Sequence, residues 1–127
     1  MSKKVLVVDD SLVVRQQIAW ALTQAGYGVV QACDGQEGFE KVQATGDFAM
    51  IICDVNMPGT DGLQMLSSMK EHGLTRCPIV MLTAEVEPEL VQQARSLGAA
   101  GWMVKPFREE TLVATVDRLT RNSKAPV

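Results

Sequence analysis

Short, uninterrupted apolar runs alternate with helix-like stretches along this chain, and that alternation is the feature that most constrains its fold. Apolar runs bounded by polar or turn residues are typical of strands covered on both faces. The predicted strands are Lys4–Val8, Val29–Cys33, Met50–Asp54, Ile79–Leu82 and Trp102–Val104. Because such strands need a helical layer on each side, the pattern predicts an α/β fold, a parallel sheet with right-handed crossovers.

The stretches between the predicted strands carry apolar residues at helical spacing. Gly26, Gly73 and Gly98 stand where helices should end, and Pro88 suits the first turn of a helix. Trp20 lies about 200° around its helix from Ile18, so we expect it to be exposed. The predicted core positions of the helices are Val14, Ile18, Leu22, Phe39, Val42, Leu63, Leu66, Met69, Val91, Ala94, Leu97, Leu112, Val116 and Leu119.

Length and composition predict a single domain. A chain of 127 residues with 46% hydrophobic content can build one sizeable core, and it contains no internal repeat or linker. We expect the domain to cover residues 1–121. Residues 122–127, which read Asn-Ser-Lys-Ala-Pro-Val, are predicted to form a flexible tail.

Charge and cysteine usage exclude several classes of function. The net charge is −3 and the basic residues are scattered, which argues against nucleic-acid binding. The apolar run before Asp9 is only four residues long, too short for a signal peptide or a membrane span, so we expect a cytoplasmic protein. The cysteines lack metal-ligand spacing, which argues against a zinc site or a structural disulfide.

Polar side chains follow four of the five predicted strands. They are Asp9 and Asp10 after the first, Asp54 at the end of the third, Thr83 after the fourth and Lys105 after the fifth. The carboxyl ends of parallel strands share one edge of the sheet, where α/β proteins bind ligands. Taken alone, each aspartate or Thr83 could be a helix cap or turn residue and Lys105 a loop residue. Together, they favour a functional site.

The chemistry of this set favours phosphoryl transfer. Three carboxylates repel one another and need a cation, and Mg²⁺ suits an all-oxygen set with no nearby His or Cys. A lysine and a hydroxyl beside the metal would position a phosphoryl group. A carboxylate can itself accept that group as an aspartyl phosphate.

Four separated motifs together resemble the receiver domain of two-component response regulators. They are Asp9-Asp10, Asp54 with the segments 56–59 and 61–62, Thr83-Ala84 and Lys105-Pro106-Phe107. The resemblance covers essentially the whole chain. It implies a flavodoxin-like (βα)5 fold with strand order 2-1-3-4-5 and helices on both faces. It also implies a cis peptide between Lys105 and Pro106.

The resemblance assigns a role to each site residue. Asp54 would be the phosphoacceptor, taking a phosphoryl group from a histidine kinase or from a small donor such as acetyl phosphate. Lys105 and Thr83 would contact phosphoryl oxygens. The implied Mg²⁺ ligands are Asp10 and Asp54 directly, Asp9 through water, and the backbone carbonyl of Asn56.

Two further roles are implied by the same resemblance. Thr83 and Trp102 would form the activation switch, with Trp102 in the place usually held by Tyr or Phe. Asn56 and Glu85 would tune the loss of the phosphoryl group. The protein would therefore be a signalling phosphoacceptor that assists its own phosphotransfer and autodephosphorylation, rather than an enzyme acting on a separate substrate.

The segment 98–107 resembles chemotaxis CheY-type receivers more than transcription regulators. Because the chain ends after its fifth helix and leaves no room for an effector domain, we expect the output to be phosphorylation-dependent binding of a flagellar switch or other motility protein. We also expect a monomer. The alternative is a phosphorelay shuttle that passes the phosphoryl group to a histidine phosphotransfer protein. A flavodoxin-like nucleotide-binding protein is disfavoured, because the crevice is acidic and lacks a glycine-rich phosphate loop.

Overall fold

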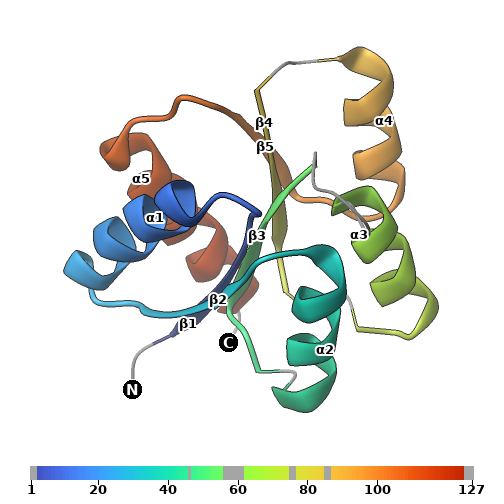
Figure 1. The fold of residues 1–127 in the computed structure, drawn as a ribbon, viewed down its shortest axis with the longest axis horizontal. Helices are drawn as coiled ribbons and strands as arrows, with labels where there is room; N and C mark the ends of the chain where they lie inside the picture. The colour runs from blue at the N-terminus through green and yellow to red at the C-terminus, as the bar shows by residue number, and fades with distance from the viewer. Residues whose placement is uncertain (1–2, 46, 56–61, 75–76, 85–86, 125–127) are drawn as a thin grey trace.

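Strands and helices alternate along the chain in a computed structural model that describes residues 3–45, 47–55, 62–74, 77–84 and 87–124 (Figure 1). The alternation confirms the predicted α/β class. In chain order the elements are β1 (Lys4–Val8), α1 (Leu12–Gln24), β2 (Gly28–Ala32), α2 (Gly35–Thr45), β3 (Met50–Asp54), α3 (Gly62–Glu71), β4 (Ile79–Thr83), α4 (Pro88–Ser96), β5 (Gly101–Val104) and α5 (Glu109–Lys124).

The strands form one parallel sheet of order β2-β1-β3-β4-β5, as expected. In its register, Val8 of β1 lies opposite Cys53 of β3, and Asp54 lies opposite Leu82 of β4. The ends of β1, β3 and β4 are therefore level with one another. This alignment brings the residues that follow β1 close to the last residue of β3.

Helices cover both faces of the sheet: α1 and α5 lie on one face, and α2, α3 and α4 on the other (Figure 1). Alternate side chains of β3 enter the two cores. Met50 and Ile52 pack toward α1 and α5, whereas Ile51 and Cys53 pack toward the other three helices. Burying each large apolar side chain contributes about 1.5–3 kcal/mol. This two-sided burial explains why the strand is apolar without interruption.

Local signals set the helix boundaries. Ser11 caps α1, its hydroxyl accepting a hydrogen bond from the Val14 N–H at 3.3 Å. Gly26 follows α1 with φ +97°, a left-handed conformation that side chains disfavour. Pro88 opens α4, as predicted.

Several predicted boundaries differ from the structure. The second strand covers Gly28–Ala32 instead of Val29–Cys33, because Gly28 pairs with Lys4 while the Cys33 N–H turns to Glu37 Oε1 at 2.7 Å. The fourth strand continues to Thr83 and the fifth begins at Gly101, because these residues still pair across the two strands. The last helix extends to Lys124, past the predicted end of the domain at residue 121. No helix breaker precedes Pro126, which explains the extension. Residues 125–127 lie outside the described part of the chain.

A membrane span is not found: across the described residues, every helix is too short or too polar to cross a bilayer.

Candidate functional site

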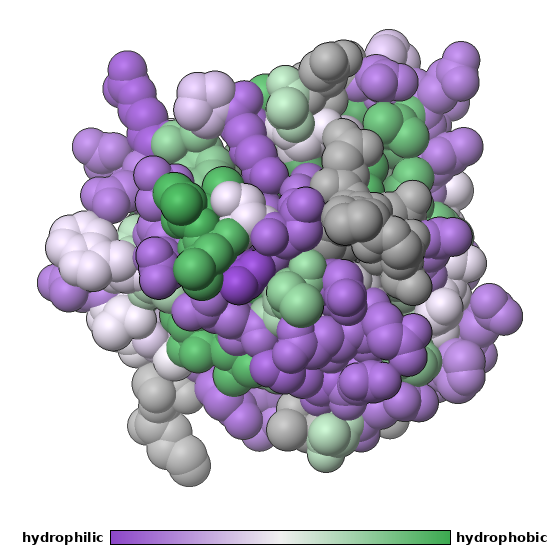
Figure 2. Space-filling model, viewed as in Figure 1, coloured by the Kyte–Doolittle hydropathy of each residue, from purple (hydrophilic) through white to green (hydrophobic). Residues whose placement is uncertain are grey.

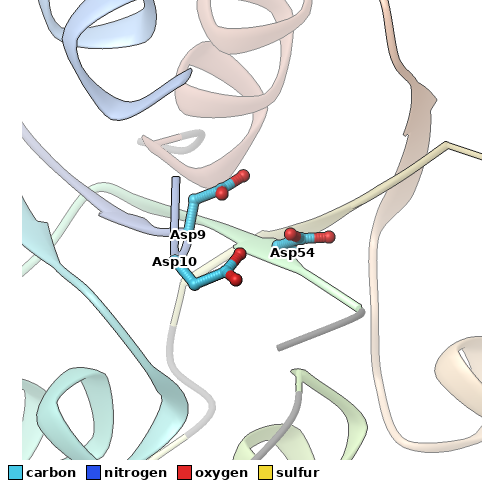
Figure 3. Close-up of side chains that lie close together, drawn as sticks. All are labelled: Asp9, Asp10 and Asp54. Carbon is cyan, nitrogen blue, oxygen red and sulfur yellow. The ribbon is translucent and has the colours of Figure 1, made fainter. Parts of the chain in front are cut away.

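Three carboxylates gather at the carboxyl ends of β1 and β3. Asp9 and Asp10 follow β1, and Asp54 is the last residue of β3 (Figure 3). One oxygen from each lies within 4.8 Å of the others. Asp9 and Asp54 are buried, whereas Asp10 is exposed. The cluster predicted from the strand ends is therefore present, with an opening to solvent at Asp10.

Lys105 supplies positive charge to the two buried carboxylates. Its Nζ lies 2.9 Å from Asp9 Oδ2 and 3.1 Å from Asp54 Oδ2. Burial lowers the pKa of Lys105, but the hydrogen bonds and charges of Asp9 and Asp54 outweigh burial and leave that pKa above its usual value. Lys105 is therefore a protonated amine aimed at the oxygens of Asp54.

The backbone around Lys105 holds it in this position. The Lys105 N–H donates to the Thr83 carbonyl at 2.7 Å, which carries the β4–β5 pairing one residue past β5. The peptide between Lys105 and Pro106 is cis, as the sequence resemblance implied.

The two carboxylate oxygens of Asp9 have different partners. Its Oδ1 accepts from the Ser11 N–H at 2.8 Å. Its Oδ2 is buried and lies 2.9 Å from Lys105 Nζ, so it forms an ion pair with that amine. This lysine faces a cluster of three carboxylates, so a cation would relieve the repulsion that remains between them.

The cluster fits Mg²⁺. Oxygens on opposite sides of an octahedral Mg²⁺ are about 4.2 Å apart, close to the spread of these three carboxylates. All the donors are oxygens, which is the preference of a hard cation. Asp9, Asp10 and Asp54 could therefore hold the ion with small adjustments.

A glycine packs directly behind Asp54. A Cβ on Gly62, the first residue of α3, would lie 2.2 Å from the Asp54 carbonyl oxygen and 2.9 Å from Met81 Cε. The Gly62 N–H donates to the Val55 carbonyl at 3.2 Å. The backbone of Asp54 is thus fixed by a close approach that only glycine permits.

Thr83 and Trp102 lie on neighbouring strands beyond the carboxylate cluster. Thr83 ends β4 and is 1% exposed. Trp102 is half-buried on β5, where its indole lines a cavity of about 80 Å³ between β5 and α4. Its Nε1 is buried and finds no acceptor among the residues described.

Two predicted site residues, Asn56 and Glu85, lie outside the described residues. Their assigned parts in metal binding and in the loss of the phosphoryl group stay predictions.

The sequence reasoning missed Arg15. The Arg15 Nη1 donates to the Asp9 carbonyl oxygen at 2.6 Å, and Nε donates to Gln31 Oε1 at 3.2 Å. The available signal was that Arg15 is the only charged residue of α1. Strand-end patterns cannot reveal it, because it reaches the site from the second turn of a helix.

Apolar side chains of α1 are exposed beside the site. Leu12, Val13 and Trp20 are 55%, 64% and 59% exposed, respectively. Figure 2 shows hydrophobic surface over the start of α1, left of centre. The exposure of Trp20 confirms the prediction made from helical spacing.

Comparison with known proteins gives one consistent family. Residues 5–117 match the family described as "Response regulator receiver domain". Chemotaxis protein CheY-3 of Vibrio cholerae is 32% identical over 117 residues, which cover 91% of this chain and 90% of CheY-3. Transcriptional regulatory protein SrrA of Staphylococcus aureus is also 32% identical, over 98% of this chain but 51% of SrrA.

Solved structures agree with this result. Chemotaxis protein CheY4 of Vibrio cholerae has a TM-score of 0.88 and 42% identity, covering 94% of this chain and 99% of CheY4. A CheY-like receiver domain protein from Methanospirillum hungatei has a TM-score of 0.90, with 98% of each chain covered. At 23% identity, that second likeness shows the fold alone.

Proposed function

Because the chain belongs to the response regulator receiver domain family, we propose that it accepts a phosphoryl group on Asp54 from the phosphohistidine of a histidine kinase. The observation that carries this proposal is the contact of Lys105 with both Asp9 and Asp54 inside the carboxylate cluster. This contact places a protonated amine beside the proposed nucleophile. We further propose that the protein acts in the cytoplasm.

The transfer is a nucleophilic substitution at phosphorus. An Asp54 carboxylate oxygen attacks the phosphorus atom, the bond from phosphorus to the donor histidine nitrogen breaks, and that nitrogen keeps the electron pair. The product is an aspartyl phosphate on this chain. A bound Mg²⁺ would supply positive charge for the phosphoryl oxygens, held by Asp9, Asp10, Asp54 and the carbonyl of Asn56.

Lys105 and Thr83 position the group that is transferred. In the phosphorylated protein, Lys105 Nζ donates to a phosphoryl oxygen in place of Asp54 Oδ2, and the Thr83 hydroxyl donates to another. Preorganised donors of this kind stabilise the charge that builds up during transfer. Water later hydrolyses the aspartyl phosphate, and Asn56 and Glu85 tune that rate.

The output is phosphorylation-dependent binding of another protein, in a chemotaxis or motility pathway. The likeness to CheY-3 and CheY4 over nearly their whole lengths supports that pathway. Thr83 and Trp102 would carry the change from Asp54 to the surface formed by α4, β5 and α5.

Phosphorylation by a small donor tests the chemistry without a kinase. The protein is incubated with acetyl phosphate and Mg²⁺ and weighed by intact-mass spectrometry. It should gain one phosphoryl group, and chelation of Mg²⁺ should prevent the gain. An unchanged mass in the presence of Mg²⁺ would contradict the proposal.

A binding experiment tests the output. The protein is compared with and without beryllofluoride, which mimics the phosphoryl group, for binding to purified flagellar switch and histidine phosphotransfer proteins. Tighter binding of a motility protein in beryllofluoride supports the proposed output. Binding only of the phosphotransfer protein would support a phosphorelay shuttle instead.

A further inference from the structure

Arg15 links the start of α1 to the acidic site without belonging to it. Its guanidinium donates to the Asp9 carbonyl oxygen at 2.6 Å through Nη1 and to Gln31 Oε1 at 3.2 Å through Nε. It is half-buried. Its hydrogen-bond partners are the backbone that carries the carboxylates and an amide of the neighbouring strand β2.

The Asp9 carbonyl lies where the sheet pairing ends. The Asp9 N–H still donates to the Ala32 carbonyl of β2 at 3.1 Å. Asp9 is the first residue beyond β1, so a side chain supplies the donor for its carbonyl. That carbonyl belongs to the peptide joining Asp9 to Asp10, and its direction sets where both carboxylates point.

Gln31 fixes the guanidinium from the other side. It lies in β2 opposite Val7 of β1, and its backbone carbonyl accepts from Lys41 Nζ of α2 at 2.6 Å. The planar guanidinium therefore has two partners in two directions, one of them on backbone and one on a side chain whose strand is itself paired. Lysine, with a single flexible amine, cannot hold both in the same way.

We propose that Arg15 is a positioning residue for the metal and phosphoryl site, holding the Asp9–Asp10 peptide so that both carboxylates converge with Asp54. This proposal rests on the proposed function, in which that cluster binds Mg²⁺. Groups that orient metal ligands from behind commonly change metal affinity 10- to 100-fold, as an order of magnitude.

The charge of Arg15 alone would have the opposite effect. A nearby positive charge repels Mg²⁺, so removing it without any positional effect would tighten metal binding. Positioning predicts weaker binding when Arg15 is lost. The sign of the change in Mg²⁺ affinity therefore separates the two roles.

Calorimetric titration of Mg²⁺ into the purified protein provides the test, with Arg15→Met, Arg15→Lys and Gln31→Ala as variants. Arg15→Met should weaken binding about tenfold or more. Arg15→Lys should give an intermediate loss. Gln31→Ala, which keeps the charge of Arg15 but removes its hydrogen bond to Gln31 Oε1, should also weaken Mg²⁺ binding. Arg95→Met, which removes an exposed arginine on α4, is the matched control and should bind as the wild type does.

Hydrogen exchange of the metal-free protein gives a second readout. The Ser11 N–H, which donates to Asp9 Oδ1, should exchange faster in Arg15→Met and Gln31→Ala than in the wild type. This measurement needs neither metal nor phosphoryl donor.

The outcomes are distinct. If the wild type binds Mg²⁺ and Arg15→Met binds it equally well or more tightly, the proposed role of Arg15 is overturned and the proposed function is left intact. Unchanged Mg²⁺ affinity in Gln31→Ala would show that the Gln31 hydrogen bond does not help to position Arg15, and would overturn the proposal as stated. Absence of Mg²⁺ binding by the wild type would overturn the proposed function and this inference together.

Discussion

At the scale of single residues, Lys105 has the largest effect on the charge of the site. It lies within 3.1 Å of oxygens on both Asp9 and Asp54, so it partly neutralises two buried carboxylates. In the proposed reaction the same amine binds a phosphoryl oxygen. Its positive charge should weaken Mg²⁺ binding, because it competes for the same carboxylates, but should assist phosphoryl transfer.

Replacing Lys105 with Met should separate those two effects. The rate of phosphorylation by acetyl phosphate should fall about 100-fold, because a donor to the transferred group is lost. Mg²⁺ should bind more tightly, because a competing cation is removed from its ligands. Initial rates and calorimetric titration measure the two quantities. An unchanged rate would exclude Lys105 from the transfer.

At the scale of elements, the close packing of α3 behind β3 fixes the backbone of Asp54. Gly62→Ala should lower the free energy of unfolding by about 3 kcal/mol, because the added Cβ would meet a backbone oxygen at 2.2 Å. Chemical denaturation measures the loss. Gly101→Ala is the control, since its Cβ would make only ordinary contact with Val80 at 3.4 Å, and its loss should be much smaller. Equal losses would contradict this packing argument.

We expect the exposed face of α1, which includes Trp20, to dock the histidine kinase. Trp20 is 59% exposed, and aromatic residues often anchor interfaces. Trp20→Ala should slow phosphoryl transfer from the cognate kinase about tenfold or more. Transfer from acetyl phosphate should be unaffected, because that donor needs no docking. Gln43→Ala, at an exposed position of α2 on the other face of the sheet, is the matched control. A normal rate of transfer from the kinase would show that Trp20 takes no part in docking.

At the scale of the whole molecule, the proposed activation passes from Asp54 across β4 to Trp102 on β5. The Trp102 indole N–H is buried and finds no acceptor within the described residues, which costs about 1–3 kcal/mol. If Thr83 moves toward the phosphoryl group, as the proposed switch requires, a conformation of Trp102 that gives this N–H an acceptor would be favoured. An energy of a few kcal/mol is enough to shift such an equilibrium.

Fluorescence tests this transmission. In a Trp20→Phe background, the emission of Trp102 should change when beryllofluoride and Mg²⁺ are added together, and not with either alone. The same additions to a variant that also carries Asp54→Asn are the control. Unchanged emission, together with unaltered partner binding by Trp102→Ala, would mean that activation bypasses this side chain.

Much of this architecture was predictable because it depends on patterns that are local in sequence. The continuous apolar run Met50–Cys53 predicts a strand buried on both faces, and its end at Asp54 predicts the site. The resemblance to receivers, rather than periodicity, supplied the strand order and the cis peptide before Pro106.

The features that escaped prediction depend on contacts between distant segments. Arg15 and Gln31 are 16 residues apart and meet only because α1 packs beside β2. The close approach of Gly62 to the Asp54 carbonyl likewise depends on the path of the folded backbone.

The extension of α5 past residue 121 was missed for a local reason. Weak helix formers such as Asn122 and Ser123 still extend an established helix.

The most direct test of the central claim is the position of the phosphoryl group. The protein is phosphorylated with acetyl phosphate and Mg²⁺ and analysed by intact-mass spectrometry alongside Asp54→Asn and a control, Asp47→Asn, which changes an exposed aspartate outside the site. The wild type and Asp47→Asn should each gain one phosphoryl group, and Asp54→Asn none. Undiminished phosphorylation of Asp54→Asn would contradict the assignment of Asp54 as the phosphoacceptor.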